Sequence, residues 1–149
     1  MEKKYKLTDE TINVGGKKLC RIEALKDFRD VKKGDKGGFI EDEHNLSHDG
    51  NSWVYDNAMV FGNAWVYGDA MVCGDAKIEN NSDYIVFKNW WSSGRYFTWT
   101  RSNDMWKVGC FYGTGDELIK KAYKDSEKSG REYERIVKYV EEIKKDNGK

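Results

Sequence analysis

A repeat of six residues runs from residue 51 to residue 80 of this chain. It reads NSWVYD, NAMVFG, NAWVYG, DAMVCG and DAKIEN, with Asn or Asp first, an aliphatic residue fourth and, in most units, Ala second and Gly last. A short fixed period is the mark of a repeat architecture. Alternation sends the Ala and aliphatic positions to one side, while Gly followed by Asn or Asp suits the left-handed backbone of a corner. The repeat therefore predicts a short left-handed parallel β-helix.

Three such units would complete one coil, so residues eighteen apart are expected to stack. Trp53 should then lie near Met71, and Phe61 near Glu79. Such an aromatic outer surface is not typical of a solvated face. We expect these residues to bury against other subunits of a homotrimer or against the C-terminal part of the chain, with some lining a ligand pocket between subunits. The outward residues are Trp53, Tyr55, Met59, Phe61, Trp65, Tyr67 and Met71.

The flanking segments predict smaller elements. Residues 5–25 have the pattern of a β-hairpin around Gly15-Gly16. Residues 84–88, 96–101 and 105–112 predict three strands, and a capping box at residues 114–117 predicts the start of the first of two helices. The expected fold class is mainly β, with an N-terminal hairpin, the β-helix and a C-terminal β-β-β-α-α module. The expected domains are 1–38 (hairpin and entry loop), 39–83 (β-helix) and 84–149 (α+β module).

Charge is segregated although the formal net charge is zero. Residues 39–87 carry one basic and nine acidic side chains, whereas residues 88–113 carry four basic and one acidic. A neutral chain has no general attraction for a long nucleic acid, so such a partner is not expected. The three cysteines show no metal-ligand spacing, and neither a signal peptide nor a long apolar run is present. A cytoplasmic protein without membrane contact is expected.

Two stretches resemble a known family. They are RIEALKDFRDVKKGDKGGFI (residues 21–40), which leads into the repeats, and FTWTRSNDMWKVGCFYGTGDEL (residues 97–118). Both are similar to hexapeptide-repeat accessory proteins of bacteriophages and prophages, and with the repeats between them they extend from residue 21 to residue 118. The resemblance implies a phage origin, and hence a place in the cytoplasm of the infected bacterial host.

Two kinds of chemistry can be weighed on the residues around the start of the repeat. Many hexapeptide β-helices are trimeric acyltransferases that use coenzyme A, and such enzymes need a general base, commonly a histidine. His44 and His48 are the two histidines of the chain, and His48 is the better placed. The surrounding stretch EDEHNLSHDG is dense in metal-ligand atoms but shows no recognisable spacing. A solvated acidic turn is the expected role, with no catalytic residue, metal ion or cofactor.

The segment after the repeat combines aromatic rings with cations. Rings stack on bases, and Arg and Lys bind phosphates. About half of the aromatic residues should instead form the core of the module. We expect phosphate contacts from Arg95, Arg101 and Lys107, and stacking on a base or ribose from Trp90, Trp91 and Tyr112.

These observations favour a binding protein over an enzyme. Together with the phage resemblance, they indicate an anti-defence sponge, which traps a nucleotide-type immune signal of the host without catalysis. The alternative is an interaction protein, either an inhibitor of a host defence enzyme or a structural part of the phage particle. A sponge should hold its ring-and-cation clusters inside a cleft, and an inhibitor should present them on an open face. The hexapeptide acyltransferase remains the enzymatic alternative.

Overall fold

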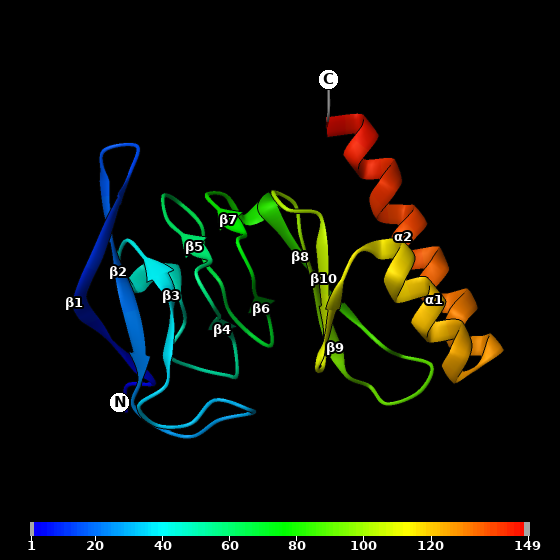
Figure 1. Ribbon diagram of the computed structural model, residues 1–149, viewed down its shortest axis with the longest axis horizontal. Helices are drawn as coiled ribbons and strands as arrows, with labels where there is room; N and C mark the ends of the chain where they lie inside the picture. Colours follow the sequence, from blue (N-terminus) through cyan, green and yellow to red (C-terminus); the bar gives the residue numbers. More distant parts are fainter. Residues whose placement is uncertain (1, 148–149) are drawn as a thin grey trace.

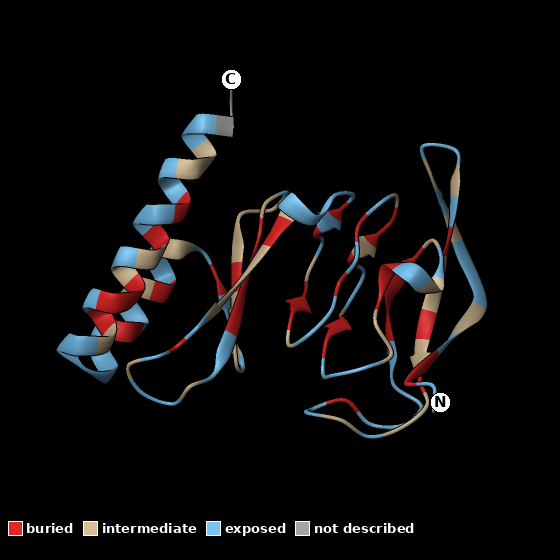
Figure 2. Cartoon of the chain, turned by 180° about the vertical axis from the view of Figure 1, so that it is seen from behind, coloured by how far each residue is buried: buried red, intermediate tan, exposed pale blue. Residues whose placement is uncertain are grey.

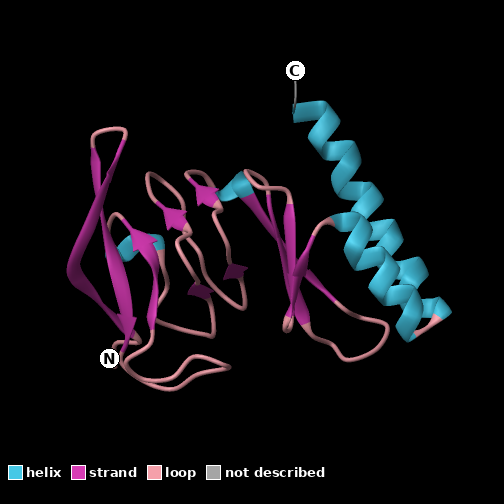
Figure 3. Ribbon diagram, in the orientation of Figure 1, coloured by secondary structure: helices cyan, strands magenta, loops and turns pink. Residues whose placement is uncertain are grey.

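The computed structural model describes residues 2–147. Figure 1 shows an N-terminal hairpin at one end, the hexad segment (residues 51–80) in the middle, and a sheet covered by two helices at the other end. Strands joined by loops form most of the regular structure before these helices (Figure 3), so the predicted mainly β chain with C-terminal helices is confirmed. The helices are α1 (Gly115–Asp125) and α2 (Glu127–Asn147). The strands are β1 (Tyr5–Val14), β2 (Lys17–Ala24), β3 (Lys36–Ile40), β4 (Trp53–Val54), β5 (Met59–Val60), β6 (Met71–Val72), β7 (Lys77–Ile78), β8 (Tyr84–Lys88), β9 (Tyr96–Thr100), β10 (Met105–Val108) and β11 (Phe111–Gly113).

The N-terminal sheet joins the hairpin to the hexad segment. β1 and β2 pair antiparallel, with Val14 opposite Lys17 across the turn. Gly15 and Gly16 form that turn with φ of 56° and 85°, values that glycine adopts without steric cost. β3 continues the sheet antiparallel to β2, and then pairs in parallel with β5, which pairs in parallel with β7. The result is one mixed sheet of five strands.

Residues eighteen apart pair across the hexad segment. Trp53 lies opposite Met71 where β4 pairs with β6, and β5 pairs with β7 at the same spacing. The glycines that end three of the units, Gly62, Gly68 and Gly74, have φ between 65° and 67°. The small and aliphatic positions of the repeat are fully buried, as their alternation predicted. This buried row consists of Ala58, Val60, Ala64, Val66, Ala70, Val72, Ala76 and Ile78.

The predicted fold class, a short left-handed parallel β-helix, is wrong for this structure. The parallel strands do not form a solenoid of their own. β3, β5 and β7 belong to a mixed sheet that starts with antiparallel strands, and β4 and β6 form a separate pair. The hexad at residues 63–68 forms no strand, and it pairs with the segment before the repeat through an isolated parallel bridge between Val66 and Leu46. Four of the five hexads form strands of two residues, whereas the hairpin strands β1 and β2 have ten and eight residues.

The chain's own flanks cover most of the outward aromatic residues. Trp53 is 1% exposed, with the ring of Phe28 from loop 25–35 at 5.2 Å from its ring centroid. Phe61 is buried in a cluster with residues of the hairpin. The exception is Trp65 and Tyr67, which are stacked at 4.2 Å and remain half exposed. Figure 2 shows buried residues in the short strands of the hexad segment and exposed residues at the turns between them.

The C-terminal sheet has the strand order β11-β10-β9-β8 and is antiparallel. The predicted β-β-β-α-α module is wrong by one strand, because Gly109, with φ of 57°, turns the chain between β10 and β11. Alternation along β9 places Phe97 and Trp99 in a core with α1 and α2, which cover one face of the sheet (Figure 1). Within residues 2–147, no helix is both long and apolar enough to cross a membrane. The division into 1–38, 39–83 and 84–149 stays a prediction, and residues 148–149 lie outside the described part.

The other face of β9 closes the end of the hexad segment. Thr98 is buried, and its Oγ1 accepts the backbone N–H of Met71 at 2.9 Å. At the more exposed corner, Ser102 Oγ accepts the N–H of Lys77 at 2.8 Å. These two hydroxyl groups accept N–H donors at the edge of the last hexads, where a further strand would otherwise pair.

Replacing Thr98 by valine is expected to lower the free energy of unfolding by about 2 kcal/mol, because the buried N–H of Met71 would lose its acceptor. Ser102→Ala is the matched control. Water can reach the exposed Lys77 N–H, so that change should cost less than about 0.5 kcal/mol. Urea denaturation of both variants checks the difference. Equal losses would show that the buried contact has no special role in holding the two parts together.

Candidate functional site

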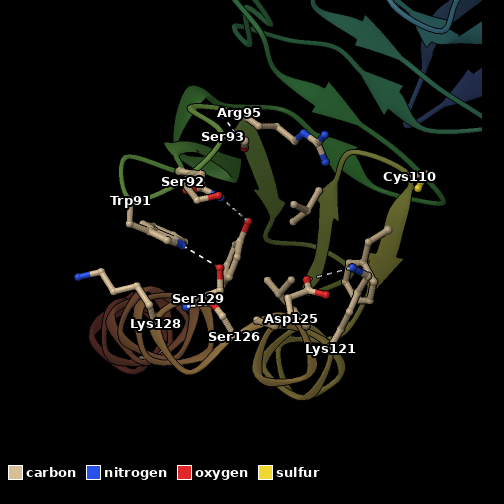
Figure 4. Close-up of a pocket in the computed structure, with 16 residues that line it drawn as sticks. Trp91, Ser92, Ser93, Arg95, Cys110, Lys121, Asp125, Ser126, Lys128 and Ser129 are labelled. Atoms are coloured by element: carbon tan, nitrogen blue, oxygen red, sulfur yellow. Dashed lines mark hydrogen bonds and ion pairs between the residues drawn. The ribbon is translucent and has the colours of Figure 1, made fainter.

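A cleft of about 540 Å³ opens where loop 89–95, between β8 and β9, faces the two C-terminal helices (Figure 4). The loop forms one wall, the turn between β10 and β11 forms a second, and the junction of α1 with α2 forms the third. In the view of Figure 4, Trp91 and Arg95 come from the loop above the helices. The volume lies in the range of small-molecule sites.

Loop 89–95 is fixed by contacts at its base and at its middle. The backbone N–H of Asn89 donates to the carbonyl of Arg95 at 2.8 Å, which closes the loop at its base. Trp91 fastens its middle to α2, because the indole Nε1 donates to Ser129 Oγ at 3.0 Å. The same indole lies edge-on to the ring of Tyr133, with ring centroids 4.9 Å apart. Trp91 is therefore a fixed aromatic wall of the cleft.

Asn89 carries the unsatisfied polar atom of this region. The residue is 5% exposed, and its Nδ2 donates to the hydroxyl of Tyr133 at 3.4 Å. Among the residues that the structure describes, its Oδ1 is the buried side-chain atom that lacks a hydrogen-bond partner. Burial raises the pKa of Tyr133, so that hydroxyl keeps its proton and can donate it. An unpaired buried amide oxygen costs about 1–3 kcal/mol, and a donor group on a ligand would remove that cost.

The cleft carries more positive than negative charge. Arg95, Lys121 and Lys128 line it, against one carboxylate, Asp125. Lys121 lies 3.6 Å from Asp125, and Lys128 lies 3.7 Å from Glu132, so both lysines have acidic neighbours. Within residues 2–147, the guanidinium of Arg95 makes neither an ion pair nor a hydrogen bond. Its five donors are therefore available to an anion.

The position of Arg95 depends on a glycine. A Cβ on Gly109 would lie 2.5 Å from Arg95 Nη1, so the guanidinium rests on the bare backbone of the turn between β10 and β11. The φ of 57° at this residue also favours glycine. The turn at Gly109, which divides the predicted third strand into β10 and β11, therefore positions the guanidinium of Arg95 at the edge of the cleft.

The structure brings three of the six predicted ligand residues together. Trp91 and Arg95 line the cleft. Trp90 is 65% exposed beside it, with its ring edge-on to Trp91 and Lys128 Nζ 5.0 Å from its ring centroid. These residues form a ring-and-cation cluster that lies partly inside a cleft and partly at its rim.

The other three predicted residues lie elsewhere. Arg101 Nη2 donates to the carbonyl of Ser82 at 2.9 Å, so this arginine ties two loops together. Lys107 points toward the hexad segment, with Nζ 5.8 Å from the ring centroid of Tyr55. Tyr112 lines a separate open pocket, where its hydroxyl accepts a hydrogen bond from an asparagine side chain at 3.2 Å. The six residues therefore do not form one site.

The histidines are both engaged within the chain. His48 Nδ1 accepts the backbone N–H of Lys4 at 3.1 Å, so its proton sits on Nε2, 2.8 Å from a Glu43 carboxylate oxygen. His44 Nε2 lies 2.9 Å from the carbonyl of Gly62, a contact that raises its pKa. Both ring nitrogens of His48 are thus engaged within the chain, and His44 Nδ1 lies 3.3 Å from Asp42 Oδ2. Within residues 2–147, no group of three His, Cys, Asp or Glu side chains is arranged to hold a metal ion.

Comparison with known proteins gives one partial likeness. No protein-family model matches the chain. An uncharacterized acetyltransferase, YdcK, of Escherichia coli (strain K12) is 41% identical over 68 residues, which cover 40% of this chain and 21% of that protein. The chain thus spans about a fifth of the length of the curated relative that it matches. The likeness concerns a segment and not the whole of either protein.

Proposed function

We propose that this chain is a binding protein that sequesters a small nucleotide-type molecule in the cleft between loop 89–95 and helices α1 and α2. The observation that carries the proposal is the unpaired Asn89 amide oxygen in a cleft that Arg95, without an acidic partner, also lines. An amide is suited to a polar group on a base, and a free guanidinium to a phosphate. Trp91 and Tyr133 supply ring surface for stacking.

The resemblance to phage hexapeptide-repeat proteins extends this proposal. The ligand would be an immune signal of the infected host, trapped in the host cytoplasm without chemical change. We expect the protein to act as a homotrimer, because the half-exposed stack of Trp65 and Tyr67 leaves aromatic surface that a second copy can cover. A monomer in sedimentation equilibrium would contradict this part of the proposal.

Acetyl transfer is the second candidate, because the partial relative in Escherichia coli is named as an acetyltransferase. The arrangement of the histidines weighs against it, since both ring nitrogens of His44 and of His48 face groups of the same chain. Binding of acetyl-coenzyme A is the readout that separates the two candidates. An inhibitor of a host enzyme would bind neither class of molecule.

The proposal is tested by thermal shift with cyclic mono-, di- and trinucleotides, linear nucleotides, ADP-ribose and acetyl-coenzyme A. A ligand that binds the folded state raises the melting temperature by mass action. We expect a rise with one class of nucleotide and none with acetyl-coenzyme A. A flat response across the nucleotides would overturn the proposal, and a rise with acetyl-coenzyme A alone would favour the transferase.

Replacing Arg95 by glutamine is expected to weaken binding of the responding nucleotide by at least about tenfold, because a charge-assisted contact to phosphate is lost. Arg131→Gln is the matched control, since this arginine is half exposed on α2 and pairs with Glu127 at 3.7 Å. Isothermal titration calorimetry of both variants gives the affinities. Unchanged affinity in the Arg95 variant would place the ligand elsewhere.

A further inference from the structure

A second pocket of about 290 Å³ adjoins the cleft. The two share Arg95 and Cys110, so the arginine stands at the boundary between them. Met71 and Tyr96 give the second pocket an apolar side, and Arg29 from loop 25–35 gives it another cation. A ligand long enough to extend from the larger cleft past Arg95 would meet Arg29 in the second pocket.

Arg29 is presented by a tight turn. Phe28 and Val31 exchange backbone hydrogen bonds of 2.9 and 2.8 Å across it. Arg29 itself has φ of 51°, a left-handed conformation that few non-glycine residues adopt. The turn thus holds the backbone at the base of this arginine in one conformation.

The charges around the second pocket leave room for an anion. Arg29 Nη2 lies 3.6 Å from Asp69 Oδ1, which is a long contact for an arginine–carboxylate pair. Asp30 is the carboxylate that lines this pocket beside the two arginines, and it accepts a hydrogen bond from the hydroxyl of Tyr55 at 3.0 Å. Arg95 has no acidic partner within the part of the chain that the structure describes. Two guanidinium groups therefore border one small pocket, and one of them is fully available.

Resting on the proposed function, we propose that the ligand is a nucleotide with a diphosphate group. The nucleoside occupies the larger cleft beside Asn89 and Trp91, and the two phosphoryl groups lie between Arg95 and Arg29. Arginine suits this role because its planar fork binds phosphate oxygens in pairs. A mononucleotide would engage Arg95 alone.

The test compares matched pairs of ligands by isothermal titration calorimetry: AMP with ADP, GMP with GDP, CMP with CDP and UMP with UDP. For the base that binds, we expect the diphosphate to bind at least about tenfold tighter than the monophosphate. Arg29→Gln should abolish this difference and leave the affinity for the monophosphate unchanged. Arg95→Gln should weaken both members of the pair, and the control Arg131→Gln should affect neither.

A second variant separates position from charge. Gly109→Ala keeps both arginines but would displace the Arg95 guanidinium from the turn, so it too should weaken both ligands. Equal binding of monophosphate and diphosphate by the wild-type protein would overturn the diphosphate proposal and leave the proposed function standing. An Arg29→Gln variant that keeps the full difference in affinity between diphosphate and monophosphate would also overturn the diphosphate proposal and leave the proposed function standing. Binding of none of the eight nucleotides would overturn the diphosphate proposal, while the wider thermal-shift panel still decides the proposed function.

Discussion

Replacing Gly38 by alanine is expected to lower the free energy of unfolding by about 3 kcal/mol or more. Gly38 lies in β3, the strand that joins the hairpin to the hexad segment. A Cβ there would overlap the backbone oxygen of Ala58 and lie 2.7 Å from a methyl group of Val54. The Ala58 oxygen accepts the N–H of Phe39 at 2.9 Å, so it cannot move away without breaking the ladder between β3 and the first hexads.

Guanidinium denaturation followed by circular dichroism measures the loss. Gly68→Asn is the control, because a Cβ at that glycine meets nothing within 4 Å and asparagine tolerates its φ of 67°. The control should lose less than about 1 kcal/mol. If the Gly38 variant is no less stable than this control, close approach of β3 to the hexads is not required. A Gly38 variant that does not fold would agree with the prediction, because it corresponds to the largest possible loss of stability.

The repeat predicted the buried row and the eighteen-residue pairing because both depend on local alternation. Ala64 and Val66, for example, are placed by their own unit and by the units next to it in the stack. The organisation of the sheets does not follow from the repeat. Whether β5 belongs to a solenoid or to a mixed sheet depends on Phe39 of β3 and hence on the hairpin, which has no hexad pattern. A local period carries no information about that junction.

Only part of the candidate site could be predicted, because the sequence indicates which residues are close along the chain and not which distant residues meet. Trp91 and Arg95 lie in a single loop, so their closeness could be inferred from the sequence. Arg101 and Lys107 face away from the cleft, because their partners come from distant parts of the chain. Asn89 forms its contact with a residue 44 positions away, and nothing in either neighbourhood indicates the pairing. Tyr133 is buried on α2, and its place in the wall of the cleft does not follow from any local pattern.

Replacing Lys4 by methionine is expected to remove a pH-dependent part of the stability. The lysine is fully buried. Its Nζ donates to the carbonyl of Ser52 at 2.7 Å, with no carboxylate partner within hydrogen-bond distance in the part of the chain that the structure describes. Burial, together with repulsion from Lys26 and Arg29, lowers the pKa of Lys4 to about 8. Above this pH the folded protein releases a proton that the unfolded chain keeps until about pH 10.5. Stability from this group therefore rises with pH between these two values.

The quantity to measure is the free energy of unfolding of the wild type minus that of Lys4→Met, by urea denaturation at pH 7 and at pH 9.5. We expect this difference to be larger at pH 9.5 than at pH 7 by about 1–2 kcal/mol. Screening of the ammonium group by solvent gives the smaller of these figures. Other groups titrate in both proteins and cancel, including Cys73, whose pKa burial raises to about 12. Lys6→Met, which removes an exposed lysine of β1, is measured at the same two pH values as the control for the loss of a lysine as such. A flat or falling difference for Lys4 would mean that its ammonium group is as well stabilised in the folded protein as in water.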